Sequence, residues 1–359
     1  ERHLGQTGRL DQLAADNGYL PQTLGFIDTV EIAETLVTDP TGVDKEFLAL
    51  AGYDSAELSD ACRTEFRELA GVMPAMEFGY RNMTPALFDG HGILKLRGDI
   101  AADLAGVTAP VPGLGGEMGG VFTYGMGMDL RKLAAFAEAR IAAIQADPYE
   151  CEQLAGLNLQ AASVQQSLNA PIPPMVYNVK GLLLKLDDLS GFMQGVGFAP
   201  QSPPDFRALL AVEGAGALYM LGASFVPGLA ELNLEPNGET VELPPGTLPN
   251  VGKPAYVAMN ESAIALGMGE KAAAGLGDML SAPPSGDEPL MALSYDLKAY
   301  SDFMQSMMES AAADDPDVDP QELGELFGLV GDFYDRVWMD VLVTERGIEI
   351  PSTVTLQQP

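Results

Sequence analysis

The chain has 359 residues, with 51 acidic against 19 basic side chains and a formal net charge of −32 at pH 7. Its length allows two domains, and a hydrophobic content of 47% indicates a folded chain rather than a disordered one. The acidic balance excludes charge-driven binding to nucleic acid or to an anionic membrane surface, because both need a basic face. No run of about 18 uninterrupted apolar residues occurs, so the sequence predicts no transmembrane helix.

The first strongly patterned part of the chain is predicted to form a strand, a glycine turn and an alanine-rich helix over residues 93–102. A strand over 121–124 follows, and Asp129 then precedes a helix. We expect a further helix over 151–168, begun by Asp147 as its N-cap, and a buried strand over 182–186.

A Pro- and Ser-rich stretch over 198–204 marks the strongest boundary in the chain, and the same order of elements then returns. Residues 264–273 resemble 93–102 in pattern, and the segment around Asp296 matches the segment around Asp129. In both segments Asp, Leu, a basic residue, an apolar residue and Phe recur at equal spacing, 167 residues apart (from 129 to 296). The last part of the chain is predicted to form a helix over 323–333 and strands over 337–343, 347–350 and 353–356.

This repetition predicts an α+β protein made by internal duplication. Each of the two similar modules should be a mostly antiparallel sheet with packed helices, because the strands are arranged as hairpins without βαβ alternation. The first module would span residues 1–199, including an N-terminal extension, and the second residues 200–359. The sequence leaves open whether the modules share one sheet.

Two cysteines, Cys62 and Cys151, are separated too widely for a metal-binding CxxC pair. They are either two buried thiols or one disulfide, and we predict the disulfide. The chain begins at Glu1 without an initiator Met, which is typical of a processed export product or of a trimmed chain. We therefore expect an extracytoplasmic protein, periplasmic or at the cell surface, whose signal peptide has been removed. A lipid anchor before Glu1 is compatible with this expectation.

Few residues carry the patterns of catalytic or cofactor sites. His91, one of only two histidines, lies in Asp-Gly-His-Gly, which predicts a hairpin turn, and we expect its replacement by Ala to leave any activity intact. The segment 267–272 fits G-x-G-x-x-A, the dinucleotide fingerprint, but Glu270 would place a carboxylate where the pyrophosphate should lie, so a tight turn is preferred.

An acidic segment offers a weak candidate for a calcium site. Asp315, Asp317 and Asp319 are spaced like the first ligands of a calcium loop, but the expected glycine and the terminal glutamate are missing. A solvated acidic loop is the preferred interpretation. The methionines at 304, 307 and 308 have helical spacing, which is typical of a packed helix face rather than of a copper site.

These observations predict no catalytic residue, no cofactor and no firm metal ligand. We expect a non-catalytic exported protein with a structural or interaction role and a protein partner. The alternative is a carrier or binding protein for an apolar small molecule such as a lipid, because the many Met and Leu side chains can line an adaptable cavity.

Overall fold

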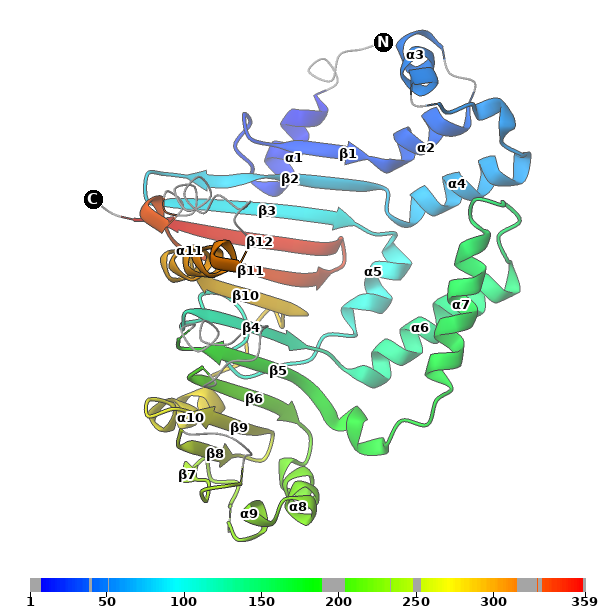
Figure 1. Ribbon diagram of the computed structural model, residues 1–359. Coiled ribbons are helices and arrows are strands. Elements are labelled where there is room, and N and C mark those ends of the chain that lie inside the picture. Colours follow the sequence, from blue (N-terminus) through cyan, green and yellow to red (C-terminus); the bar gives the residue numbers. More distant parts are fainter. Residues whose placement is uncertain are drawn as a thin grey trace.

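The computed structural model describes residues 8–38, 41–50, 52–188, 204–232, 234–247, 253–314, 328 and 331–357. Within these residues the chain forms one 12-stranded antiparallel sheet with helices on both of its sides and beyond one end of its strands (Figure 1). The strands are β1 (Gly25–Asp28), β2 (Ala75–Met83), β3 (Leu87–Lys95), β4 (Phe122–Gly127), β5 (Val179–Leu186), β6 (Phe206–Val212), β7 (Val241–Glu242), β8 (Ala255–Met259), β9 (Ala263–Met268), β10 (Met291–Asp296), β11 (Tyr334–Thr344) and β12 (Gly347–Leu356).

The helices lie between the strands in the chain. They are α1 (Arg9–Asn17), α2 (Thr29–Val37), α3 (Gly42–Leu50), α4 (Asp60–Val72), α5 (Gly98–Ala105), α6 (Leu130–Ala146), α7 (Ala155–Leu168), α8 (Ala215–Phe225), α9 (Pro227–Ala230), α10 (Ala272–Ser281) and α11 (Leu297–Asp314), with short 3₁₀ turns at Ser55–Glu57 and Pro174–Asn178. No helix in the described ranges combines the length and the hydropathy that a membrane span needs.

The strand order across the sheet is β1-β2-β3-β12-β11-β10-β4-β5-β6-β9-β8-β7. Every pairing is antiparallel, which confirms the predicted α+β class with antiparallel strands. Residues 1–199 and 200–359 both contribute strands to this sheet, so the two ranges share one sheet. The division between them falls at 189–203, outside the described residues.

The two predicted repeat segments lie side by side at the centre of the sheet. β4 pairs with β10, and Gly125 is opposite Ala292. Asp129 follows β4 and Asp296 is the last residue of β10, and both act as N-caps. The Asp129 carboxylate accepts the backbone N–H of Arg131 at 3.0 Å, and that of Asp296 accepts the N–H of Ala299 at 2.9 Å. The strand, turn and helix predicted over 93–102 and 264–273 are also present, as β3 with α5 and β9 with α10.

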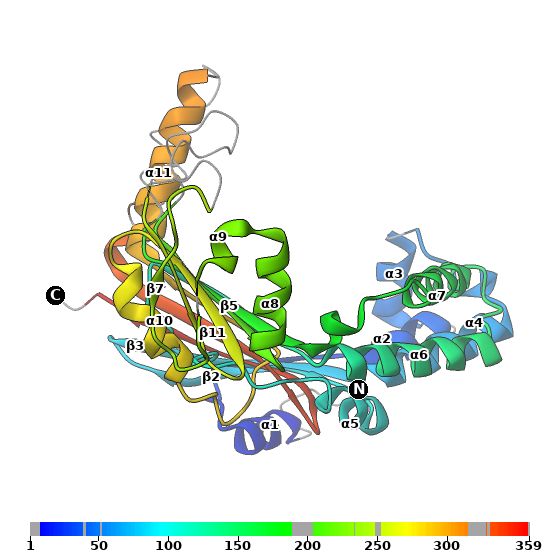
Figure 2. The ribbon, with the colours of Figure 1, turned by 90° about the horizontal axis from the view of Figure 1, so that it is seen from below.

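One face of the sheet, which we call the packed face, is closely covered. The loop carrying Val111 and Leu114 packs with α10 against small and branched residues of the strands, and Leu183 and Leu209 are almost fully buried there. Tyr19, after α1, lies directly against the backbone of Gly79. Figure 2 shows α1 and α5 on this side, whereas α8 and α11 rise from the other side.

Helices α2, α3, α4, α6 and α7 form a group beyond one end of the strands, which we call the helical arm (Figure 1). The predicted Cys62–Cys151 disulfide is present and connects α4 to the segment before α7. The Glu65 carboxylate accepts the backbone N–H groups of Glu150 at 2.7 Å and Cys151 at 3.0 Å. These contacts hold residues 150–151 outside a helix, so α7 begins later than the predicted residue 151. Asp147 ends α6 instead of beginning α7.

Candidate functional site

The second face of the sheet carries large apolar side chains, and we call it the apolar face. At the sheet centre Phe122, Tyr124 and Met126 of β4 are paired with Tyr295, Leu293 and Met291 of β10, and all six are only partly buried. The register extends this face across the neighbouring strands. Its further members include Val337, Met339, Val341 and Val343 of β11, Ile348, Ile350, Val354 and Leu356 of β12, Leu182 and Leu184 of β5, Leu94 and Phe88 of β3, and Met76, Phe78, Tyr80 and Met83 of β2.

The alternation along the central strands is the reverse of the usual arrangement. The residues that point to the packed face are small: Thr123, Ala292 and Ser294 are completely buried. Gly125 is required there, because a Cβ would lie 2.6 Å from a methyl group of Leu114 and 2.9 Å from one of Leu183. The large side chains therefore point away from the core, although a soluble sheet normally turns its large apolar residues toward it.

Among the described residues, helices cover the apolar face near one edge and one end. Tyr219 of α8 and Leu229 of α9 pack with Val257 and Met259 of β8, and so cover the edge formed by β8 and β9. Tyr300 of α11 contacts the ring of Tyr295, with ring centroids 5.8 Å apart. At the opposite edge, Ile27 and the β2 side chains Met76, Phe78, Tyr80 and Met83 are each between 39% and 45% exposed.

The apolar face carries almost no charge. Outside the β-bulges, none of the described strand residues that point to this side is charged, and the bulge residue Arg81 donates to the Asn17 carbonyl oxygen on the packed face. Buried charges lie on the packed face instead, among them Glu77 and Glu349. An uncharged apolar surface that extends over several strands favours binding of apolar groups rather than of ions or polar substrates.

A buried polar network lies on the packed face beneath α1, and its centre is His91. His91 lies inside β3 and not in a hairpin turn, so that prediction is wrong. The Tyr19 hydroxyl is 2.9 Å from His91 Nδ1, and His91 Nε2 is 2.9 Å from the Glu349 carboxylate. Burial lowers the pKa of His91, with a further contribution from the Arg81 charge, and burial raises the pKa of Tyr19 to about 12.

The network continues away from His91 through charged partners. Arg346 donates to Glu349 at 2.6 Å and to the Asn17 side-chain oxygen at 2.9 Å, and Asn17 donates to Glu77 at 3.0 Å. Glu77 also pairs with Lys95. The Tyr–His–Glu order resembles a catalytic relay, but Tyr19 and His91 are each only 4% exposed, so neither can reach a substrate in this state. The evident role of this polar network is to hold α1 and the residues after it against the sheet.

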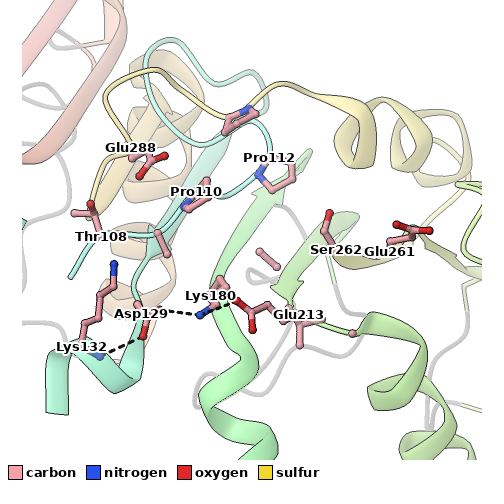
Figure 3. A pocket seen from close by; sticks show the side chains of 15 residues that line it. Thr108, Pro110, Pro112, Asp129, Lys132, Lys180, Glu213, Glu261, Ser262 and Glu288 are labelled. Atoms are coloured by element: carbon pink, nitrogen blue, oxygen red, sulfur yellow. Dashed lines mark hydrogen bonds and ion pairs between the residues drawn. The ribbon is translucent and has the colours of Figure 1, made fainter. Parts of the chain in front are cut away.

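A cavity of about 730 Å³ opens where β4 and β6 end and β5 begins (Figure 3). Lys180 contributes its ammonium, which lies 2.8 Å from the Asp129 carboxylate and 3.1 Å from that of Glu213. The hydrogen bond that Lys180 donates to Asp129 raises the pKa of Lys180, so the lysine stays protonated and is not a proton acceptor at neutral pH. Burial raises the pKa of Asp129, but its hydrogen bonds from Lys180 and from backbone N–H groups outweigh this and lower it.

The remaining candidate residues are placed as follows. Asp315, Asp317 and Asp319 lie outside the described residues, so the calcium interpretation stays a prediction. In the described part of the chain no group of three or more His, Cys, Asp or Glu residues is arranged to hold a metal ion. Gly269, in the G-x-G-x-x-A segment, has a φ of 99° and forms a turn against the Asp205 carboxyl group. A pyrophosphate at this turn would therefore meet a carboxylate.

No protein-family model matches the sequence, and no curated protein matches it. The apolar face was not among the features expected from the sequence, although a signal for it is present there. In Phe-Thr-Tyr-Gly-Met-Gly over 122–127 and Met-Ala-Leu-Ser-Tyr over 291–295, large and small residues alternate strictly. This pattern shows that each strand has one bulky and one small side, but it does not tell which side is open.

Proposed function

We propose that this protein is a non-catalytic binding protein for a hydrophobic ligand of the lipid class, and that the ligand lies on the apolar face. The supporting observation is that the central strands turn their large apolar side chains away from the core and their small ones toward it. Packing against the described helices does not account for this orientation at the sheet centre, and binding of an apolar ligand would account for it. Covering apolar surface contributes about 25 cal/mol per Å², so even partial coverage of such a face yields substantial affinity.

The chemistry of the face favours a lipid over a polar ligand. Its central side chains include Met126, Met291 and Met339, which are flexible and adapt to ligands of irregular shape. The lack of charge on this face means that the bound part of the ligand is itself uncharged. The non-catalytic role is supported by the burial of His91 and by the charged state of Lys180.

Mass spectrometry under native conditions, before and after organic extraction, tests the proposal. We expect an apolar adduct that disappears on extraction. Replacement of Leu182, which is 37% exposed on the apolar face, by Asn should weaken binding of a hydrophobic probe such as Nile red. Leu159→Asn is the matched control, because Leu159 is 75% exposed on α7 of the helical arm. Equal loss of probe binding in both variants, or no binding by the unmodified protein, would contradict the proposal.

The proposed location is outside the cytoplasm, in the periplasm or at the cell surface. The Cys62–Cys151 disulfide supports this, because such bonds form and persist in oxidising compartments. An assay of the bond in protein taken directly from the source cell, alkylated before lysis, checks the location. Reduced cysteines in that sample would argue against it.

A structural or interaction role with a protein partner is the second candidate, and one observation favours it. The helical arm exposes apolar side chains of its own: Val43 is 79% exposed and Leu50 89% exposed on α3, besides Leu159 on α7. A partner that binds there would be lost from pull-downs with Leu50→Asp and Leu159→Asp but retained with Leu182→Asn.

Internal duplication is part of the same proposal. From one edge to the centre the strand order is β1-β2-β3-β12-β11-β10, and from the other edge to the centre it is β7-β8-β9-β6-β5-β4. The two orders are equivalent, because each strand of one half corresponds to the strand six numbers away in the other half. The local dyad would pass between Gly125 and Ala292. An experimental structure tests this: one rotation about that axis should carry β4 onto β10, β5 onto β11 and β6 onto β12 together.

A further inference from the structure

Residues 9–23 lie over the packed face and then follow the edge of β2, and we call them the N-terminal segment. Beyond the pairing of β1 with β2, the backbone N–H of Leu20 donates to the Tyr80 carbonyl oxygen at 2.8 Å. The N–H of Tyr80 donates in turn to the Thr23 hydroxyl at 3.2 Å. The N-terminal segment therefore occupies backbone groups at one edge of the sheet, beside exposed apolar side chains of β2.

Tyr19 anchors this segment to the buried histidine of the polar network. Its ring lies over the Gly79 backbone, and its hydroxyl is 2.9 Å from His91 Nδ1. Burial raises the pKa of Tyr19 to about 12, so the hydroxyl keeps its proton. Burial also raises the pKa of Glu349, but the hydrogen bonds from Arg346 and Thr344 outweigh this and lower it, so the carboxylate is ionised at neutral pH.

These protonation states assign the tautomer of His91. An ionised Glu349 can only accept, so His91 Nε2 carries the ring proton and donates to Glu349 at 2.9 Å. His91 Nδ1 is then the acceptor, and the Tyr19 hydroxyl donates to it. The anchor of the N-terminal segment thus requires a neutral histidine.

A second proton on His91 breaks this anchor. It must bind Nδ1, which turns the acceptor of the Tyr19 hydroxyl into a donor. The described residues provide no other acceptor for this hydroxyl, and both side chains are buried. Protonation in the closed state therefore leaves a buried donor without a partner, which is unfavourable.

The charges around His91 also oppose its protonation. They come from β2, β3, β12 and the turn before β12: Glu77, Arg81, Lys95, Glu349 and Arg346. The charged side chains of α1 are exposed or paired away from this site: Arg9, Asp11 and Asp16. Burial lowers the pKa of His91 and the Arg81 charge lowers it further, and together they outweigh the effect of Glu349.

We propose that the N-terminal segment is an acid-operated latch. Protonation of His91 favours an open state in which α1 and Tyr19 leave the packed face while the rest of the sheet stays folded. Opening uncovers the Gly79 backbone and frees the backbone N–H and C=O groups of Tyr80 at the edge of the sheet.

The size of the response follows from proton linkage. In the open state His91 is exposed and takes up a proton at its ordinary pKa of 6.5, whereas in the closed state it stays neutral. The stabilisation of the closed state is present above pH 6.5 and is lost as the pH falls below it. The opening constant should therefore rise about ten-fold between pH 7.5 and pH 5.5.

Hydrogen–deuterium exchange of the full chain tests the proposal, read by mass spectrometry of peptic peptides and corrected for intrinsic exchange rates. The measured quantity is the opening constant of the N-terminal segment at the two pH values, with β4 as the internal reference. His91→Gln removes the titrating group. Tyr19→Phe is the matched control, because it weakens the same anchor by removing the hydroxyl but keeps the histidine.

We expect the opening constant to rise about ten-fold on acidification of the unmodified protein, while β4 stays protected. Tyr19→Phe should open more at pH 7.5 and still respond to acid, because burial and the Arg81 charge act on His91 in this variant as well. His91→Gln should open equally at both pH values.

Three results would overturn the proposal. The first is an opening constant of the unmodified protein that is the same at both pH values. The second is an acid response of the same size in His91→Gln. The third is loss of protection in β4 together with the N-terminal segment, because acid would then unfold the sheet and not open a latch. The first and third are measured on the unmodified protein alone, so they decide the question even if His91→Gln does not fold.

Discussion

At the scale of single residues, His91 links the structure to pH. Its pKa is lowered by burial, so the folded protein holds it neutral while the unfolded chain takes up a proton below pH 6.5. Burial raises the pKa of Glu349, but hydrogen bonds from Arg346 and Thr344 outweigh this and lower it below its ordinary value. In both cases the unfolded state binds more protons in acid, so the stabilisation is present at neutral pH and is lost as the pH falls.

We therefore predict that the urea midpoint is constant from pH 8 to about pH 7 and decreases from pH 6.5 downward, with a second decrease below pH 4.5. His91→Gln should lower the midpoint at pH 8, because it disrupts the contacts with Tyr19 and Glu349, and should remove most of the first decrease. The control is His3→Gln, since His3 is the only other histidine. A first decrease of the same size in His91→Gln and in the unmodified protein would show that His91 is not its source.

The error about His91 shows which residue-level facts are hidden in a sequence. Glycines on both sides of His91 favour a turn when only neighbours are considered. In the structure Gly90 is needed because Ser352 and Tyr80 approach its backbone, and His91 is held by Glu349, 258 residues away along the chain. A partner at that distance leaves no local pattern, so the burial of His91 could not be predicted.

At the scale of elements, the disulfide is the main covalent link within the helical arm. It closes a loop between residues 62 and 151, a separation of 89 residues, and it lies in a small core with Leu154 and Phe66. The chain-entropy argument gives such a loop about 4.6 kcal/mol of stability. We predict that Cys62→Ala/Cys151→Ala lowers the free energy of unfolding by about that amount, measured by urea denaturation.

The arm lies beyond the strand ends, so the same double variant should bind Nile red as tightly as the unmodified protein. The unmodified protein treated with a reducing agent is the control, and it should match the double variant in stability. Two free thiols in a titration of the unfolded, unreduced protein would refute the bond itself.

Elements whose causes are local were predictable from the sequence. The Asp129 and Asp296 segments were expected to place a strand before a helix, and each aspartate is the N-cap of its helix because its carboxylate accepts backbone N–H groups two or three residues ahead. Asp147 failed as a predicted N-cap for a tertiary reason: Glu65, on α4, binds the backbone of residues 150–151 and delays the start of α7.

At the scale of the whole molecule, the sequence predicted the class of fold but not that all the strands pair into one sheet. Antiparallel hairpins were expected, yet the pairing of β3 with β12 joins the first part of the chain to its end, and hairpin patterns do not encode such pairings. The apolar face was missed for a related reason. Alternation identifies the two sides of a strand, but only the packed loop around Leu114 reveals that the small side is the inner one.

An acidic molecule with an uncharged apolar face should show opposing forces between its copies. At low ionic strength the net charge of −32 keeps copies apart, whereas about 1 M salt shortens the screening length to about 3 Å and leaves the apolar attraction unopposed. We predict a monomer in 50 mM sodium chloride and reversible association in 1 M, measured by sedimentation velocity. Leu182→Asn should reduce the association and Leu159→Asn should not, because only Leu182 lies on the apolar face. The reverse result would place the self-associating surface on the helical arm and favour the protein-partner role over ligand binding.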